Sequence, residues 1–288
     1  MARSSPLCGS DVTMESKVSK VSIGDLSTAK RSGRKLVGVV AWDYQMARIA
    51  DRVGVDIVSV GDTVGTNLWG HDNPLEVTLD EMLVVCKAVR RGVRRALVSC
   101  DFPFGPLQQG PDEAVRAALR LVKEGGADMV KLDGAADYTD GVEAVVRAGI
   151  PVFAQFGVTP QSALRHGVAY ANAAGSGAVV TAELADEMLR QALALQAAGA
   201  AILDFTNSGP VVGPAVVAGV DIPVVGGFGG GPWLDGRIRM AHAAIGYAAG
   251  GLDSPPDTYA DVARIAFDAL GEYACDVRAG RQIKGQPR

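Results

Sequence analysis

A repeated unit, one short apolar run followed by one amphipathic stretch, constrains the fold of this chain more than any other feature. Seven runs are nearly continuously apolar and rich in β-branched residues, at 36–41, 55–61, 96–100, 127–132, 151–155, 200–205 and 223–227. Such runs are typical of strands buried on both faces, as in a parallel sheet covered by helices. Between them, 113–124 and 184–198 carry apolar residues at helical spacing. We expect an eighth strand around Ile238–Ile245.

The number of repeats predicts the architecture. Seven or eight βα units in 288 residues favour an α/β fold of the closed (β/α)8 TIM barrel type over an open doubly wound sheet. We predict a single barrel domain over residues 21–288. The preceding segment, 1–20, is rich in Ser and lacks the apolar stretch of a signal peptide, so we predict a flexible tail.

Charge and cysteine usage exclude several classes of protein. The formal net charge is −4, which gives no attraction to nucleic acid or to an anionic membrane surface. No apolar run reaches the roughly 18 residues that a membrane span needs. The four cysteines include no CxxC pair, so a disulfide framework and a zinc site are not expected, and the composition fits a reducing cytoplasm.

Acidic residues gather where the predicted strands end. Asp62, Asp101, Asp133 and Asp204 belong to four different strand ends, and Lys131 lies among them. In a parallel barrel these ends form one mouth, where chemistry takes place. Clustered carboxylates repel one another unless a cation neutralises them, and oxygen ligands without Cys or His suit Mg²⁺. A small 2-oxo acid can chelate such an ion through its keto oxygen and one carboxylate oxygen, and the ion then stabilises the enolate, with a lysine beside the substrate's negative charge.

Each of these residues also has a purely structural interpretation. A single Asp after a strand is more often a helix N-cap than a ligand, and Asp43 is of that kind. Lys131 could be an ion-pair partner only. The glycines at 226–231 fit either an anion-binding loop or a flexible turn. The segment 167–177 fits either a mobile flap or an ordered loop. Four acidic positions at one barrel end favour a site, since capping alone does not explain them.

Four lone side chains receive separate interpretations. His71 is interpreted as a residue at the mouth of the barrel. His166 and His242 are interpreted as structural. Cys100 precedes Asp101 in a strand, so its side chain points to the opposite side and is expected in the core.

The chain also resembles the ketopantoate hydroxymethyltransferase (3-methyl-2-oxobutanoate hydroxymethyltransferase) family of the phosphoenolpyruvate mutase-like barrel superfamily. Eight stretches carry the resemblance, in the family's order and at its spacing from about residue 35 to about residue 250. They are Ala41-Trp42-Asp43-Tyr44, Val60-Gly61-Asp62-Thr63-Val64-Gly65, Gly70-His71-Asp72, Val77-Thr78-Leu79-Asp80-Glu81-Met82, Asp101-Phe102-Pro103-Phe104-Gly105, Val130-Lys131-Leu132-Asp133-Gly134, Gly157-Val158-Thr159-Pro160-Gln161-Ser162 and Asp235-Gly236-Arg237.

The resemblance implies an oligomeric (β/α)8 enzyme that uses Mg²⁺ and 5,10-methylenetetrahydrofolate to add a hydroxymethyl group to a branched 2-oxo acid. It implies that Asp62 and Asp101 are metal ligands and that Asp62 and Thr63 also contact the acid. Lys131 matches a substrate-binding lysine. Asp133 matches a glutamate associated with the metal and is one methylene shorter.

Three departures from the family pattern affect the chemistry. Thr206 stands where the family has its proposed general base, a glutamate, and a threonine hydroxyl is no base near neutral pH. Asp204 lies two residues earlier on the same strand face and is the candidate replacement. Gln155 stands in place of a family histidine, and the Ala- and Gly-rich segment 167–177 stands in place of the family's Gly-Gly-Tyr-Lys-Val-Gln-Gly loop.

We therefore weigh three hypotheses. The first is a metal-dependent aldol-type transferase in which Asp204 acts as base and Lys131 binds the 2-oxo acid. The second is a lyase or decarboxylase of a 2-oxo acid on the same scaffold, which the Thr206 substitution favours. The third is a binding relic without turnover.

Overall fold

Eight parallel strands form a closed barrel in the computed structural model, which describes residues 19–162, 165, 167, 184–253 and 257–285. The strands follow one another around the barrel in chain order, and β8 pairs with β1 to close it. They are β1 (Leu36–Val40), β2 (Ile57–Val60), β3 (Leu97–Asp101), β4 (Met129–Leu132), β5 (Val152–Gly157), β6 (Ile202–Thr206), β7 (Val224–Gly226) and β8 (Gly236–Met240). The predicted TIM barrel is confirmed.

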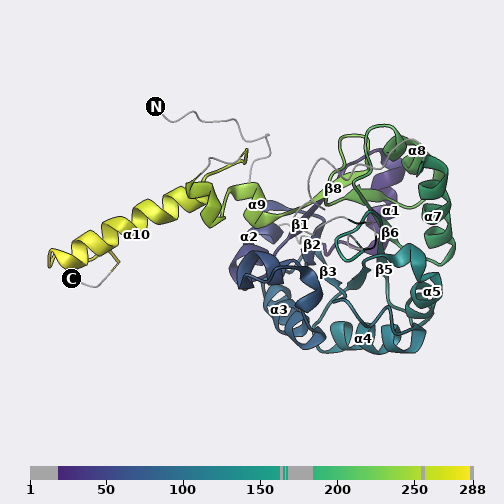
Figure 1. Cartoon of the computed structure of the whole chain (residues 1–288), viewed down its shortest axis with the longest axis horizontal. Coiled ribbons are helices and arrows are strands. Elements are labelled where there is room, and N and C mark those ends of the chain that lie inside the picture. The colour runs from purple at the N-terminus through teal and green to yellow at the C-terminus, as the bar shows by residue number, and fades with distance from the viewer. Residues whose placement is uncertain (1–18, 163–164, 166, 168–183, 254–256, 286–288) are drawn as a thin grey trace.

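Helices surround this barrel on most of its circumference (Figure 1). The surrounding helices are α2 (Tyr44–Val53), α3 (Leu79–Gly92), α4 (Pro111–Lys123), α5 (Thr139–Arg147), α7 (Ala185–Ala197) and α8 (Val212–Gly219). The chain also has α1 (Ile23–Ser32) before β1, and α9 (Ala241–Ile245) and α10 (Val262–Arg278) after β8, of which α10 extends away from the barrel. Single turns η1 (Gly65–Trp69), η2 (Pro74–Glu76), η3 (Ala135–Asp137) and η7 (Ala249–Leu252) complete the connections. The helical stretches predicted at 113–124 and 184–198 correspond to α4 and α7.

Side-chain caps fix where the first helices after the strands begin. Asp43 accepts hydrogen bonds from the backbone N–H groups of Gln45 and Met46 at 2.8 and 2.9 Å, so it caps α2 as the sequence indicates. Thr78 and Glu81 form a reciprocal capping box at the start of α3. These caps satisfy backbone donors that helix starts leave free, and they assign Asp43 to the scaffold.

The amino end of the barrel is closed by α1. Leu26 and Ala29 of this helix are buried and share a hydrophobic cluster with inward-facing strand residues such as Phe153 and Ile202. A second, larger cluster lies between the strands and the outer helices. With one end filled, the polar side chains at the carboxyl ends of the strands are left to form the accessible mouth.

The eighth strand differs from its prediction. The expected segment was Ile238–Ile245, whereas β8 ends at Met240 and residues 241–245 are helical. The reason is visible in the pattern: β8 alternates exposed Arg237 and Arg239 with buried neighbours, so it lacks the continuous apolar run of the other strands. The Ala-rich segment that follows has high helix propensity.

Some expectations fall where the structure gives no description. Residues 1–18 of the tail predicted over 1–20 lie outside the described residues. His166 and residues 168–177 of the flap candidate 167–177 lie outside them as well. Within the residues that are described, no helix combines the length and apolar character needed to cross a bilayer.

Candidate active site at the carboxyl ends of the strands

A cavity of about 210 Å³ opens at the carboxyl ends of the strands. All six side chains predicted for the site line it, namely Asp62, Thr63, Asp101, Lys131, Asp133 and Asp204. They come from β2, β3, β4 and β6 or from the turns directly after these strands. The in-register parallel pairing of adjacent strands therefore brings residues that are far apart in sequence to one rim.

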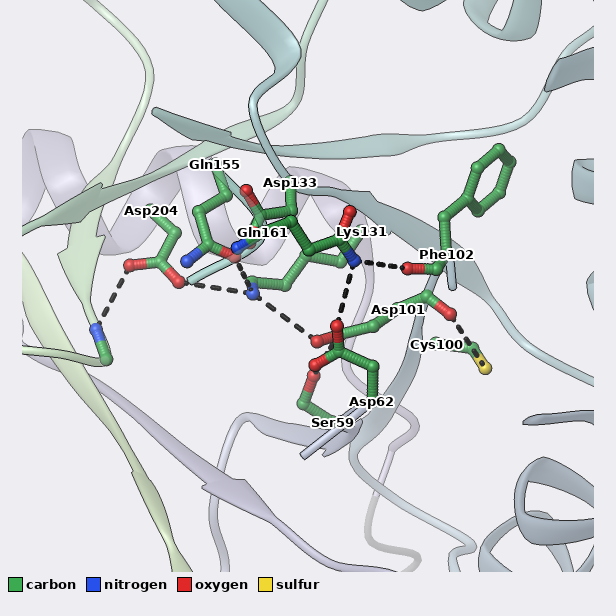
Figure 2. Close-up of polar contacts among 12 residues, drawn as sticks. Ser59, Asp62, Cys100, Asp101, Phe102, Lys131, Asp133, Gln155, Gln161 and Asp204 are labelled. Atoms are coloured by element: carbon green, nitrogen blue, oxygen red, sulfur yellow. Dashed lines mark hydrogen bonds and ion pairs between the residues drawn. The ribbon is translucent and has the colours of Figure 1, made fainter. Parts of the chain in front are cut away.

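Asp62 and Asp101 lie beside each other on neighbouring strand ends (Figure 2). The Ser59 hydroxyl approaches one Asp101 oxygen at 3.4 Å, and the Gln161 side-chain amide donates to Asp62 Oδ2 at 2.8 Å. Burial raises the pKa of Asp62 to about 6 and that of Asp101 to about 7, and the charge of Asp62 adds to the shift of Asp101. Two carboxylates held so close favour either a shared proton or a shared cation.

Lys131 lies at the centre of the polar network. Its ammonium is 3.5 Å from Asp101 Oδ2 and 3.4 Å from Asp204 Oδ2, and it donates to the side-chain oxygen of Gln155. Burial disfavours the ammonium, but the charges of Asp101 and Asp204 outweigh that effect, and the pKa of Lys131 is raised. The lysine therefore remains a cation at neutral pH, and it forms ion pairs as well as lining the cavity.

Asp133 carries an oxygen without a hydrogen-bond partner. Its Oδ2 accepts from the backbone N–H of Gln161 at 3.3 Å, whereas its buried Oδ1 has no partner among the described residues. Burial raises the pKa of Asp133 to about 6. A buried carboxylate oxygen that lacks a donor costs free energy unless a ligand, water or ion meets it.

The two β6 residues considered for the position of the general base, Asp204 and Thr206, have different surroundings. Asp204 lines the cavity, and its Oδ1 accepts from the backbone N–H of Gly227 at 3.0 Å. Thr206 is fully buried, and its hydroxyl accepts from the Gln155 side-chain amide at 2.9 Å. Gln155 thus joins Thr206 to Lys131. Of the two β6 side chains, only Asp204 is in contact with the cavity.

Arg239 lines the cavity, and two residues beside the site, Gln161 and Asn207, likewise received no role from the sequence. Gln161 binds Asp62, the backbone oxygen of Phe102 at 3.1 Å and, through its own N–H, Asp133. It belongs to the Thr159-Pro160-Gln161-Ser162 stretch, so the resemblance was a signal that could have identified it. Asn207 follows β6 with φ 56°, the one non-glycine residue with positive φ among the described residues. Such backbone strain is concentrated at functional sites.

The donor set is compatible with a hard divalent cation. Within the described ranges, no three His, Cys, Asp or Glu side chains are close enough together to hold an ion by themselves. Mg²⁺ does not need such a cage, because it is usually held by one or two carboxylates and keeps other positions for water and substrate oxygens. The adjacent pair Asp62 and Asp101, with the unpartnered oxygen of Asp133 nearby, fits this mode.

The remaining side chains that the sequence singled out lie outside the cavity. Cys100 is buried in the core, as expected, and burial raises the pKa of its thiol. His242 is buried and packs against Trp42, with 4.8 Å between the two ring centroids, in keeping with a structural role. His71 contacts the Trp69 ring rather than the cavity lining.

In the glycine segment 226–231, by contrast, Gly227 and Gly229 line the cavity, and a Cβ at Gly229 would come within 2.8 Å of Asn207.

Several known proteins are similar to this chain in sequence. A family model described as ketopantoate hydroxymethyltransferase matches residues 20–282. The chain is 39% identical to the 3-methyl-2-oxobutanoate hydroxymethyltransferase of Cyanothece sp. over 263 residues, which covers 90% of this chain and 96% of the relative. It is 38% identical to the enzyme of the same name from Gloeobacter violaceus, covering 90% and 97%.

Solved structures share the fold at much lower identity. A putative phosphonomutase from Burkholderia cenocepacia aligns with a TM-score of 0.58 at 17% identity, covering 90% of this chain and 100% of that chain. A 2,3-dimethylmalate lyase aligns at 0.58 and 16%, covering 93% and 99%. Phosphonopyruvate hydrolase, in complex with oxalate and Mg²⁺, aligns at 0.57 and 16%, covering 92% and 91%.

Proposed function

Because this chain belongs to the ketopantoate hydroxymethyltransferase family, we propose that it transfers a hydroxymethyl group to an enolised 2-oxo acid at the rim of β2, β3, β4 and β6. The observation that carries the proposal is the convergence of four aspartates and one lysine on one small cavity. A cavity of about 210 Å³ suits a small acid. The protein is an enzyme, so the hypothesis of a relic without turnover is not retained. We further propose a cytoplasmic homo-oligomer.

We propose Mg²⁺ as the cation, with Asp62 and Asp101 as its ligands and Asp133 associated with it. The unpartnered Asp133 oxygen and the adjacent Asp62 and Asp101 carboxylates support this assignment. The solved phosphonopyruvate hydrolase, which shares the fold, contains Mg²⁺ together with oxalate. When bound, such a cation withdraws electrons from the keto oxygen of the acid and stabilises negative charge there.

Lys131 would hold the acid in place. Its raised pKa keeps it charged, and its side chain lines the cavity between Asp101 and Asp204. A buried ammonium attracts the substrate carboxylate more strongly than an exposed one because the local dielectric is low. Thr63, also buried at the rim, adds a hydroxyl that can donate to the same acid.

We propose Asp204 as the base. It takes a proton from carbon 3 of the acid, and the electrons of the broken C–H bond form the enolate. The enolate carbon then bonds to a carbon at the formaldehyde level, whose C=O π electrons move to its oxygen, and that oxygen takes up a proton to give the hydroxymethyl group. Asp204 lines the cavity with an oxygen directed at Lys131, whereas the Thr206 hydroxyl is engaged by Gln155.

The one-carbon donor that the family resemblance implies is 5,10-methylenetetrahydrofolate. The cavity of about 210 Å³ is too small to enclose a folate together with the acid. We therefore derive no step through the folate and propose it only as a second substrate approaching from the mouth. Product formation from 3-methyl-2-oxobutanoate with methylenetetrahydrofolate, compared with free formaldehyde, tests that assignment. Equal rates with both would contradict it.

Exchange of the carbon-3 proton in D₂O tests the proposed chemistry without any donor. With Mg²⁺ and 3-methyl-2-oxobutanoate, the wild-type protein should exchange this proton, and Asp204→Asn should reduce the rate by about 10²- to 10⁴-fold, the usual contribution of a positioned base. Asp112→Asn, an exposed acid in the first turn of α4, is the matched control and should exchange normally. Unchanged exchange in Asp204→Asn would remove this residue from the role of base.

The engaged Thr206 hydroxyl also favours a second candidate, a lyase or decarboxylase of a 2-oxo acid. Bond cleavage can generate the enolate without removing a proton from carbon 3. Incubation of 2-oxo diacids with Mg²⁺ distinguishes the two activities, since release of CO₂ or pyruvate in the absence of carbon-3 exchange indicates the lyase.

A further inference from the structure

Two of the departures from the family pattern contact each other inside the barrel. Gln155 lies in β5 and Thr206 in β6, and the Gln155 amide nitrogen donates to the Thr206 hydroxyl oxygen at 2.9 Å. The side-chain oxygen of Gln155 accepts a hydrogen bond from Lys131 of β4. Two hydrogen bonds therefore connect side chains of three consecutive strands, and the reaction proposed above gives neither Gln155 nor Thr206 a part.

The orientation of the Gln155 amide follows from its two partners. An ammonium group only donates hydrogen bonds, so the Gln155 atom that faces Lys131 must be the oxygen. The amide nitrogen is then directed at Thr206, whose hydroxyl oxygen can accept a hydrogen bond. In the reverse orientation, the amide N–H groups would point at the ammonium. Gln155 is 2% exposed and Thr206 is fully buried, so bulk water has little access to either hydrogen bond.

The acidic neighbours of Lys131 cannot hold its ammonium constantly. Asp101 and Asp204 lie 3.5 and 3.4 Å from it (Figure 2). Asp101 is also a proposed ligand of the cation, and Asp204 is the proposed base. The charge around both carboxyl groups therefore changes when the site is filled and when a proton is transferred. Gln155 and Thr206 carry no charge near neutral pH, so their hydrogen bonds do not depend on these changes.

We propose that Gln155 is a positioning residue: with its amide oriented by Thr206, it holds the Lys131 ammonium where the carboxylate of the 2-oxo acid binds. The lysine ammonium is carried on a flexible four-carbon stem, and fixing it before binding lowers the entropy that is lost when the acid binds. The identity of the ligand rests on the proposed function. The position of the ammonium does not, and it can be measured without any substrate.

NMR of protein labelled with ¹⁵N-lysine follows the Lys131 ammonium directly. A buried, hydrogen-bonded ammonium exchanges its protons slowly with water, and the Lys131→Met variant identifies its signal. Gln155→Met, which nearly keeps the side-chain length, should shift this signal or abolish it. Thr206→Val removes only the hydroxyl that orients the amide and should act in the same direction, whereas Thr206→Ser keeps the hydroxyl and should retain the signal. An unaltered Lys131 signal in Gln155→Met would overturn the proposal.

The carbon-3 exchange reaction separates positioning from a purely structural role. If Lys131 binds the acid equally in the ground state and the transition state, displacing its ammonium raises the acid concentration at half-maximal exchange and leaves the maximal rate nearly unchanged. We expect a rise of about 10- to 100-fold in Gln155→Met, the usual effect of losing a hydrogen bond to a charged group. Gln109→Met, at an exposed position, is the matched control and should behave as the wild type.

A double variant tests whether Thr206 acts through Gln155. Once Gln155 is replaced, Thr206→Val has no amide left to release, so the combination of both substitutions should equal Gln155→Met alone. Additive effects would contradict the proposal. So would a lower thermal stability of Gln155→Met with an unchanged half-saturating concentration of the acid, since that result indicates a structural role only.

The outcomes also distinguish this proposal from the proposed function. A wild-type protein that does not exchange the carbon-3 proton would contradict the proposed function, while the Lys131 signal would still report whether Gln155 holds the ammonium. If Gln155→Met does not fold, the comparison of Thr206→Val with Thr206→Ser gives the same test. Equal Lys131 signals and equal half-saturating concentrations in these two variants would then overturn the proposal.

Discussion

Gln161 illustrates how a neutral side chain can control a charged site. It donates to Asp62 through its amide and to Asp133 through its backbone N–H, and so connects two of the proposed metal-associated acids. Its hydrogen bond lowers the pKa of Asp62, whereas burial raises it to about 6. We therefore regard Gln161 as a positioning residue that keeps Asp62 ionised and correctly oriented.

Substituting this residue gives the first prediction. Gln161→Leu should weaken Mg²⁺ binding at neutral pH by about 10- to 100-fold, the usual effect of removing a partner of a metal ligand. The loss should be smaller at higher pH, because raising the pH restores the ionised form of Asp62. Calorimetric titration with Mg²⁺ at several pH values measures both effects. Gln109→Leu, at an exposed position nearby, serves as the control. A uniform loss at all pH values would indicate a steric effect instead.

Asp101 gives a prediction about stability. Its ordinary pKa of 3.8 is raised to about 7 in the folded protein, so between these values the folded state holds a proton that the unfolded chain has released. The free energy of unfolding of the metal-free protein should therefore fall as the pH rises from about 4 to about 7. Asp62 and Asp133 act in the same direction, with pKa values of about 6.

The contribution of Asp101 can be isolated by difference. Asp101→Asn should make this decline shallower, and urea unfolding in the presence of EDTA at a series of pH values measures the slope. Asp112→Asn, a surface acid, should retain the wild-type slope. Identical slopes in wild-type and Asp101→Asn proteins would show that the carboxyl group does not hold its proton in the folded state.

At the scale of helices and strands, close approach of two helices gives a third prediction. Gly92 ends α3, and a Cβ there would come within 2.6 Å of the Tyr44 backbone oxygen and 3.0 Å of Ala47 in α2. Gly92→Ala should therefore cost about 1–3 kcal/mol, the range for overpacked sites. Gly271→Ala in α10 meets no atom within 4 Å and should stabilise the helix by about 0.5–1 kcal/mol. Thermal unfolding of both variants measures the contrast, and equal effects would contradict the packing account.

The elements also explain how far the sequence could be interpreted. Strands β2 to β7 were predictable because both of their faces are buried, which demands continuous apolar runs. β8 was misplaced because its outer face is polar and exposed, so the signal that identified its neighbours is absent. α1 was not foreseen, since its two buried residues, Leu26 and Ala29, are too few to create a strong periodic pattern.

The acids of the site could be predicted because they follow from topology. Once the strands are assumed to form a closed parallel barrel, one rim must carry all four acids, namely Asp62, Asp101, Asp133 and Asp204. The contacts of Gln155 and Gln161 could not be predicted, because they depend on the rotamers and loop conformations that place an amide between two strands. The choice between Asp204 and Thr206 likewise required the hydrogen bond that engages the threonine.

At the scale of the whole molecule, α1 fills one end of the barrel and charged side chains gather around a cavity at the other end. Four aspartates line it together with two bases, Lys131 and Arg239, so its net charge is negative when all are ionised, and a divalent cation would offset that charge. The central claim is therefore that cation and 2-oxo acid bind together, with Asp62 and Asp101 holding the cation.

Calorimetric titration of 3-methyl-2-oxobutanoate, with Mg²⁺ and with EDTA, tests this claim most directly. Mg²⁺ should tighten binding of the acid by roughly tenfold or more, and the acid should tighten binding of Mg²⁺ by the same factor, because the coupling of two ligands is reciprocal. Asp101→Asn should remove the coupling, while Asp112→Asn should retain it. Equal affinity for the acid with Mg²⁺ and with EDTA would contradict the account.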